Sequence, residues 1–189
     1  LEKYQDDDGN PDPAKIEQEK FRWLEFYKVK FKGSWYTRLF DKLVLRTHTE
    51  FGFLGAFNND RGVIPFDRFF LGGDGMSQYA MDGRETISLR GYPNQSLSTQ
   101  DGSTIYNRFS LELRYPITLK PAASIFGLTF LETGQGYNSF REFNPFNGKR
   151  SLGLGLRIFM PAFGLLGIDF GYGLDAVNDF DLTPNGWET

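Results

Sequence analysis

The chain has 189 residues, a formal net charge of −3, no cysteine and one histidine. The slightly acidic net charge excludes a broadly basic nucleic-acid surface, and the lack of cysteine excludes disulfides and thiol chemistry. Glycine (22 residues) and phenylalanine (20 residues) are abundant, which fits a membrane β-barrel as well as a β-sandwich. No apolar run approaches the roughly 20 residues of a transmembrane helix, so only a closed barrel could cross a membrane.

The chain begins with a polar stretch, and residues 1–18 predict a solvated loop. Asp6 to Asn10 loosely resembles a calcium-binding loop but lacks the glutamate that completes one. The start also lacks the basic and then apolar pattern of a signal peptide, so we expect the chain to begin inside a longer protein. From Phe21 to Trp35, apolar side chains alternate with lysines, and this period of two predicts the first strand.

The second predicted strand runs from Leu43 to Phe57, with one apolar face and one face that carries Arg46, His48 and Glu50. His48 beside a glutamate invites a catalytic interpretation, but no convincing serine or aspartate set accompanies it, so we interpret it as structural. Aromatic residues of the first strand region are predicted to lie near the two membrane interfaces, with ordinary packing as the alternative. These residues are Trp23, Trp35, Tyr36 and Phe40.

A connection of 46 residues, 58–103, separates the second strand from the third. It is too long for an idle loop in a compact fold, and its two characteristic runs are Phe69–Gly75 and Gly83–Tyr92. A phosphate-binding loop would need a following helix and lysine, which the sequence does not show. Three glycines are expected to allow close backbone approach or positive φ. They are Gly72, Gly73 and Gly91.

Four more strands are predicted after this connection, at Ile105–Ile117, Ser124–Tyr137, Ser151–Met160 and Leu166–Leu174. The last two alternate large apolar residues with glycine or charged residues, which is typical of a barrel wall between lipid and lumen. In the strand before them, Phe126, Leu128 and Phe130 share a face with Glu132, and the alternation does not explain why.

Short and long connections alternate along the chain, as they do between the periplasmic turns and the external loops of outer-membrane barrels. Each predicted strand has about ten residues or more, which is enough to cross a bilayer when tilted. Six strands do not close a lipid-exposed barrel, for which about eight is the smallest number. We therefore expect the missing strands to lie outside this chain.

The long connection is similar to the sixth external loop of the BamA family, whose hallmark is an Arg-Gly-aromatic tip, here Leu89-Arg90-Gly91-Tyr92. The resemblance covers Phe21 to Asp175, and the loop looks most like versions from Bacteroidota. The chain departs from the family in carrying Glu132 where an aspartate is usual, and in stopping before the family's final strand. Further motifs follow in the family's order, at Leu111–Pro116, Phe130–Gly134, Arg150–Gly155 and Met160–Leu166.

The resemblance implies an all-β fold, in which residues 1–189 are the C-terminal six strands of one transmembrane antiparallel β-barrel of about sixteen strands. Residues 1–18 would form an external loop. Residues 58–103 would form a long external loop that folds into the lumen and plugs it. Residues 175–189 would form an external loop before a missing last strand.

The resemblance also implies a site, in which the loop tip Arg90, Gly91 and Tyr92 is anchored on Glu112 and Glu132 of the inner wall. An arginine fork can hold carboxylates bidentately, and burying it unpaired would cost several kcal/mol. The alternation independently places Glu112 on the polar face of its strand. The simpler alternative is that Arg90 is a solvated loop residue and Glu112 an ordinary lumen charge.

By this resemblance, the protein lies in the outer membrane of a Gram-negative bacterium and folds and inserts β-barrel proteins there as the central subunit of the assembly machinery. Its partners would be unfolded outer-membrane β-barrel proteins, accessory lipoproteins and outer-membrane lipids, with no nucleic acid, cofactor, metal or catalysis. A TamA-like factor or a two-partner secretion transporter is the alternative, because these share the loop motif. A barrel enzyme would need an activated nucleophile, and a plain porin would lack the Arg-Gly-Tyr loop.

Overall fold

The computed structural model of the chain contains eight strands. Among the residues that the structure describes, no helix is long and apolar enough to cross a membrane. The strands are β1 (Phe26–Phe40), β2 (Leu43–Ala56), β3 (Phe69–Leu71), β4 (Glu85–Ile87), β5 (Ile105–Lys120), β6 (Ala123–Tyr137), β7 (Lys149–Met160) and β8 (Gly164–Gly173). The structure describes residues 26–57, 63, 67–74, 84–99, 101–120 and 123–177.

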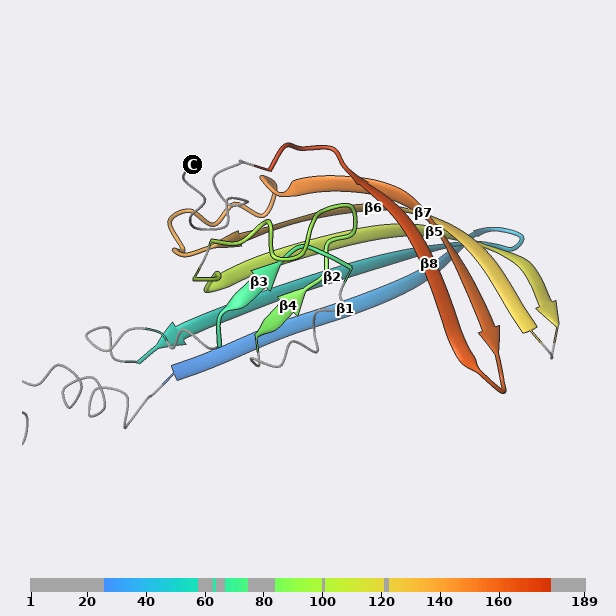
Figure 1. Ribbon diagram of the computed structural model, residues 1–189, viewed down its shortest axis with the longest axis horizontal. Helices are drawn as coiled ribbons and strands as arrows, with labels where there is room; N and C mark the ends of the chain where they lie inside the picture. Colours follow the sequence, from blue (N-terminus) through green and yellow to red (C-terminus); the bar gives the residue numbers. More distant parts are fainter. Residues whose placement is uncertain are drawn as a thin grey trace, which may run out of the picture.

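Six long strands form one antiparallel sheet in the order β1-β2-β5-β6-β7-β8 (Figure 1). This order confirms the predicted all-β fold of six antiparallel strands. Within the described residues β1 and β8 are the two edges, so the sheet is not closed in this chain. The short strands β3 and β4 pair in parallel with each other, and the sequence analysis did not predict them.

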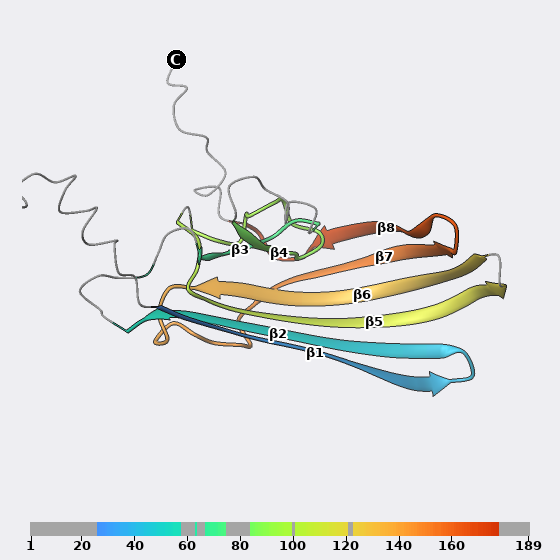
Figure 2. The same cartoon turned by 90° about the horizontal axis from the view of Figure 1, so that it is seen from below.

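The two faces of the sheet differ in chemistry. The face that carries Arg46, Glu112, Glu132 and Asp169 is called the inner face, and β3 and β4 lie over it (Figure 2). The opposite, outer face is apolar and exposed; Phe170, for example, is 77% exposed. Exposed apolar side chains of this kind recur on β1, β5, β6, β7 and β8, among them Val29, Leu113, Leu131, Leu154 and Ile168, while the apolar outer residues of β2 are partly buried. Such a face suits contact with lipid.

The aromatic residues predicted for the membrane interfaces do not share one face. Trp35 is on the outer face and is 54% exposed, as expected. Tyr36 pairs in register with Arg46, and its ring lies 5.7 Å from the guanidinium carbon of Arg114, so it belongs to the inner face. The prediction for Tyr36 was therefore wrong, because adjacent residues of a strand point to opposite faces. Trp23, Asp6 to Asn10 and all of residues 1–18 lie outside the described residues.

The structure explains why apolar residues of β6 share a face with Glu132, which the alternation in the sequence left unexplained. Leu128 and Phe130 point inward beside Glu132 and are almost completely buried. Their neighbours across the β6–β7 ladder are Gly155 and Gly153, which leave room for them. A Cβ atom at Gly153 would meet the Phe130 ring, and one at Gly155 would meet the Leu128 side chain.

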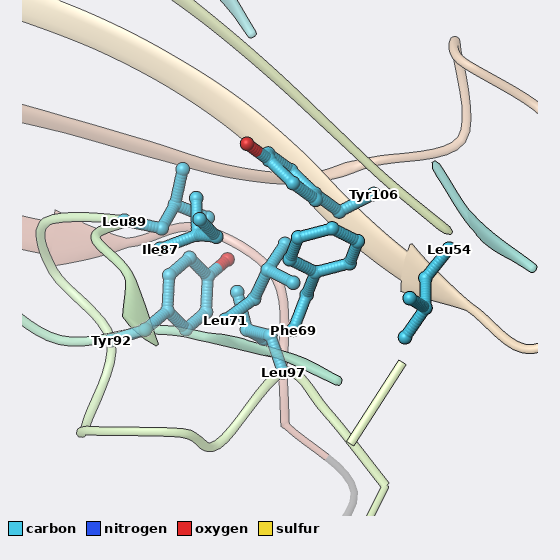
Figure 3. Packing of buried hydrophobic residues seen from close by; sticks show 8 residues of the cluster. All are labelled: Leu54, Phe69, Leu71, Ile87, Leu89, Tyr92, Leu97 and Tyr106. Carbon is cyan, nitrogen blue, oxygen red and sulfur yellow. The ribbon is translucent and has the colours of Figure 1, made fainter. Parts of the chain in front are cut away.

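A small apolar core lies between the long connection and the sheet (Figure 3). Phe69 of β3 packs edge-to-face on Tyr106 of β5, with ring centroids 4.6 Å apart. The Phe69 amide and carbonyl also exchange hydrogen bonds of 2.8 Å with Ser103, so the start and the end of the connection are joined. The core is formed by Leu54, Phe69, Leu71, Ile87, Leu89, Tyr92, Leu97 and Tyr106. The described part of the connection is thus a packed unit on the inner face.

Candidate functional site

Arg90 lies at the centre of a group of carboxylates on the inner face. Its Nη2 donates to Glu132 Oε1 at 2.6 Å and to Glu112 Oε1 at 2.7 Å, and its Nη1 donates to Asp169 Oδ2 at 3.2 Å. The Arg90 backbone N–H also donates to Glu132 Oε2 at 3.0 Å. The Arg90 side chain is only 11% exposed, while Glu132 is fully buried. The structure therefore brings together the arginine and both glutamates named from the sequence.

The strand register explains how one arginine reaches three strands. Glu112 of β5 pairs with Phe130, and Glu132 of β6 pairs with Ser110, so the two glutamates are diagonal neighbours on the inner face. Asp169 of β8 lies opposite Gly155 of β7. Because the β7 strand between the two acids carries glycines on this face, the guanidinium can extend across it.

Asp169 is a member of the site that the sequence analysis missed. Its position on the glycine-rich face of its strand was visible in the sequence, but that alternation gives only the face and not the partner. The contact with Arg90 spans 79 positions in the chain, and it depends on β8 lying two strands away from β6 in the sheet.

Each acid is also paired with an arginine of the wall. Arg108 donates to Glu132 at 2.8 Å, and Arg114 donates to Glu112 at 2.5 Å. Arg157 contacts both oxygens of Asp169 at 2.6 Å. Buried charges of this kind are tolerated when each one is paired and hydrogen-bonded. Each acid therefore has a partner on the wall in addition to Arg90 of the loop, and the buried Arg90 guanidinium in turn depends on these acids.

An aromatic ring supports the Arg90 guanidinium from one side, with the guanidinium carbon 3.7 Å from the centroid of Phe130. A guanidinium in this position gains a cation–π interaction in addition to its ion pairs. Burial by itself lowers the pKa of Arg90, but the hydrogen bond and charge of Glu132, together with Glu112, outweigh it and raise the pKa above its ordinary value. Arg90 thus stays protonated on the inner face.

Gly91 and Tyr92 attach the loop tip to the far edge of the sheet. Gly91 has φ +92°, and a Cβ atom there would lie 2.8 to 3.0 Å from backbone atoms of Tyr172 and Gly173 in β8. Only glycine combines this conformation with so close an approach. The Tyr92 hydroxyl donates to the Arg150 carbonyl at 2.6 Å and accepts from the Asp175 amide at 3.2 Å. The tip therefore contacts β7 and the end of β8.

Gly72 and Gly73 hold the two halves of the long connection together. Both have positive φ, +113° and +94°. The Gly73 amide donates to the Tyr92 carbonyl at 3.1 Å, and a Cβ atom at Gly72 would lie 2.6 Å from the Pro93 carbonyl oxygen. These glycines place β3 directly against the turn that carries the loop tip, as the sequence analysis expected from glycine in a packed loop.

A second set of ion pairs connects the loop with β1, and the sequence analysis did not name it. Lys28 and Lys30 contact the Glu85 carboxylate at 3.0 and 2.9 Å. Lys28 also contacts Asp67 at 3.4 Å. The alternating lysines of the first strand were a visible signal, because they predict a basic stripe on one face, but their acidic partners are distant in the chain.

His48 has a serine partner that the sequence analysis did not find. Ser34 Oγ and His48 Nδ1 are 2.7 Å apart, and His48 Nε2 lies 2.7 Å from Glu50 Oε1. The serine comes from β1, directly across the ladder from His48. Arg46 also donates to the Ser34 hydroxyl at 3.3 Å, and Arg108 lies 3.6 Å from Glu50. We interpret this row as part of the polar inner wall, and no group of metal-binding residues is found in the described part of the chain.

Comparison with known proteins agrees with this architecture. The Omp85 superfamily domain matches residues 16–188. Among solved structures, the chain is similar to BamA from Haemophilus ducreyi lacking POTRA domains 1–3, with a TM-score of 0.62 and 20% sequence identity. The similarity covers 80% of this chain and 32% of that one, so this chain spans about a third of its structural relative. A comparison with curated proteins gave no match.

The family match covers nearly the whole chain, and the fold of the structural relative agrees with the six-stranded sheet. The resemblance predicted from the loop and strand motifs is thereby confirmed. So are the predicted location and the kind of membrane protein, a β-barrel of the Gram-negative outer membrane. The chain belongs to the Omp85 superfamily of outer-membrane assembly and insertion factors.

Proposed function

We propose that the intact protein folds and inserts β-barrel proteins into the outer membrane as the central subunit of an assembly machine. This chain is then the C-terminal part of its barrel. Residues 58–103 plug the lumen, and residues 175–189 lead to the last strand of the barrel. The observation that supports this proposal best is the anchoring of Arg90 by three carboxylates of the inner wall.

The anchored loop has a mechanical role in this proposal. An insertion machine of this type offers an exposed strand edge to an incoming chain, and such edges pair readily with another strand. Opening a barrel at a seam removes hydrogen bonds that lipid cannot replace. A loop that joins β1, β5, β6, β7 and β8 on the inner face would keep the wall in shape while the seam opens. Completing the hydrogen bonds of the new barrel would supply the driving force, without ATP.

The proposed partners follow from this role. Unfolded outer-membrane β-barrel proteins are the substrates, and they arrive at the strand edge of the seam. Accessory lipoproteins assist, and outer-membrane lipids surround the apolar outer face. The protein performs no covalent chemistry in this proposal.

The experiment is an insertion assay with the intact protein reconstituted into vesicles. A urea-unfolded barrel protein is diluted into the vesicles, and its folded fraction is followed by heat-sensitive electrophoretic migration. We expect the wild type to accelerate folding and Arg90→Ala to lose most of that acceleration, while Arg90→Lys keeps part of it. Arg38→Ala is the matched control, because Arg38 is an exposed arginine of β1. Wild-type protein without any acceleration would overturn the proposal, and export of a bound protein without folding would favour a secretion transporter.

A further inference from the structure

The connection between β6 and β7 folds back onto the outer face of the sheet, away from β3 and β4 (Figure 2). Phe140 stacks on Phe53, an outer-face residue of β2, with ring centroids 5.6 Å apart and planes at 5°. Phe143 packs edge-to-face on Tyr137 at 5.4 Å. The Tyr137 hydroxyl donates to the Asn144 carbonyl at 2.5 Å. Residues 138–148, named here the outer flap, therefore cover one end of the lipid-facing surface.

The outer flap changes the burial of the residues beneath it. Ile105 and Asn107 point to the outer face of β5, yet they are 1% and 0% exposed. Further along the same face, Leu111 is 44% exposed and Ile117 is 64% exposed. Asn107 Nδ2 donates to the Pro145 carbonyl at 3.2 Å. The flap thus binds the amide nitrogen of a polar side chain on the lipid-facing wall, while the Asn107 Oδ1 atom is buried without a partner in the described residues.

The exposed surface of the flap continues the apolar surface that it covers. Phe146 is 94% exposed and Phe140 is 63% exposed. On the neighbouring strand ends, Phe57 is 71% exposed and packs against Tyr27 at 5.3 Å. Aromatic side chains at this level of a barrel occupy the boundary between lipid headgroups and acyl chains.

A pocket of about 430 Å³ lies between the flap and the ends of β1 and β2. Its walls are mainly apolar, and one of its lining residues, Arg141, carries a positive charge. Unlike the inner-wall arginines, Arg141 has no side-chain hydrogen bond or ion pair with any residue that the structure describes. The pocket is lined by Tyr27, Leu54, Ile105, Asn138, Phe140 and Arg141, among others.

We propose that this pocket binds a phosphorylated membrane lipid at the barrel rim. Arg141 holds the lipid phosphate, because a guanidinium binds phosphate oxygens through a bidentate fork. Tyr27 and Phe140, both exposed, contact the upper part of an acyl chain, and Phe146 enters the membrane beside it. Since the longer loops of outer-membrane barrels lie on the extracellular side, the lipid belongs to the outer leaflet. The flap then anchors this end of the wall in the membrane, independently of the insertion role.

The position of the flap is tested with nitroxide labels on the intact protein in phosphatidylcholine vesicles. This chain has no cysteine, so a cysteine introduced into it is unique once any others in the protein are replaced. Phe146→Cys is compared with Leu154→Cys on the outer face, a lipid reference, and Asn94→Cys on the inner side, a water reference. We expect the ratio of oxygen to nickel-complex accessibility at position 146 to be several-fold higher than at position 94. Equal ratios at the two positions would overturn the proposal.

The phosphate contact is tested by native mass spectrometry of the intact protein in detergent with added phosphatidylglycerol. We expect Arg141→Glu to lower the fraction of lipid-bound protein several-fold, Arg141→Lys to keep most of it, and Phe140→Ala to lower it without loss of folding. Arg38→Glu, at the opposite end of β1, is the control and should leave the fraction unchanged. Equal loss with Arg38→Glu, or displacement of the lipid by millimolar inorganic phosphate, would overturn the assignment of a lipid site.

Discussion

The long connection is held to the sheet at two places that differ in burial and in the kind of cation. At β5, β6 and β8, a loop arginine that is 11% exposed meets three wall carboxylates, one of them fully buried. At β1, two wall lysines, of which Lys30 is 40% exposed, meet the loop carboxylate of Glu85. The two anchors have opposite polarity, since the cation belongs to the loop in one and to the wall in the other.

Ion pairs with equal contact distances at the two places need not contribute equally to stability. An exposed ion pair is screened by water and salt and contributes about 0–1 kcal/mol. Removing one partner of a buried pair leaves an uncompensated charge and costs about 3–5 kcal/mol. We call Arg90 with Glu112, Glu132 and Asp169 the arginine anchor, and Glu85 with Lys28 and Lys30 the lysine anchor. The arginine anchor should therefore contribute most of the free energy that holds the loop on the sheet, and the lysine anchor should contribute less.

The largest loss of stability is expected for Glu132→Gln. The substitution preserves shape but removes the carboxylate that Arg90 and Arg108 share, so we expect a loss of about 3–5 kcal/mol in the free energy of unfolding. Glu132→Asp keeps the charge and should lose less. The measurement is urea unfolding of the intact protein in detergent micelles, with the exposed Glu142→Gln as control. A loss no larger than that of the control would contradict the dominance of the arginine anchor.

A smaller effect is expected for Gly91→Ala, which tests the contact of the loop tip with β8. A side chain at φ +92° costs about 1–2 kcal/mol from backbone conformation alone, and the new Cβ atom would also collide with the β8 backbone. Gly164→Ala is the matched control, because Gly164 has φ +87° and no atom within 4 Å of the added Cβ. Unfolding midpoints should fall for both variants and further for Gly91→Ala; equal decreases would show that the tip does not rest on β8.

Substitutions in the lysine anchor should change the free energy of unfolding still less. We expect Lys30→Ala and Glu85→Ala each to cost about 1 kcal/mol or less, with a coupling below 1 kcal/mol in the double-mutant cycle. Raising the salt concentration should reduce this coupling, because the pair is partly exposed. A coupling as large as that between Arg90 and Glu132 would remove the distinction between the two anchors.

The smallest effect is a pH dependence at the end of β8, where the Tyr92 hydroxyl also binds. The hydrogen bond from the Arg150 side chain lowers the pKa of Asp175 from 3.8 to about 2. A carboxyl whose pKa is lower in the folded state contributes stability above its unfolded pKa, and loses it as the pH falls toward 2. The stability difference between wild type and Asp175→Asn should be present at neutral pH and vanish near pH 2. Asp101→Asn, at another exposed loop aspartate, is the control; a difference that persists at pH 2 would contradict this account.

Parts of the site were predictable because they depend on local periodicity or on a short motif. The loop tip was found from Arg90, Gly91 and Tyr92 in succession, and Glu112 from the alternation of its own strand. Asp169, Glu85 and Ser34 could not be assigned to partners in this way. The contacts of Asp169 and Glu85 join segments that are distant in sequence, and that of Ser34 depends on the register of the β1–β2 pair. A period of two gives the face of a residue but not its neighbour on the adjacent strand.

The amino-acid sequence alone determined the six strands, the apolar side of most of them, and the family to which the chain belongs. These follow from alternation and from motifs whose residues are close in the chain. Only the tertiary structure decided that Phe130 supports Arg90, that glycines of β7 open the way to Asp169, and that residues 138–148 fold onto the outer face. Such contacts are set by sheet order and register, because packing joins residues that no local pattern connects.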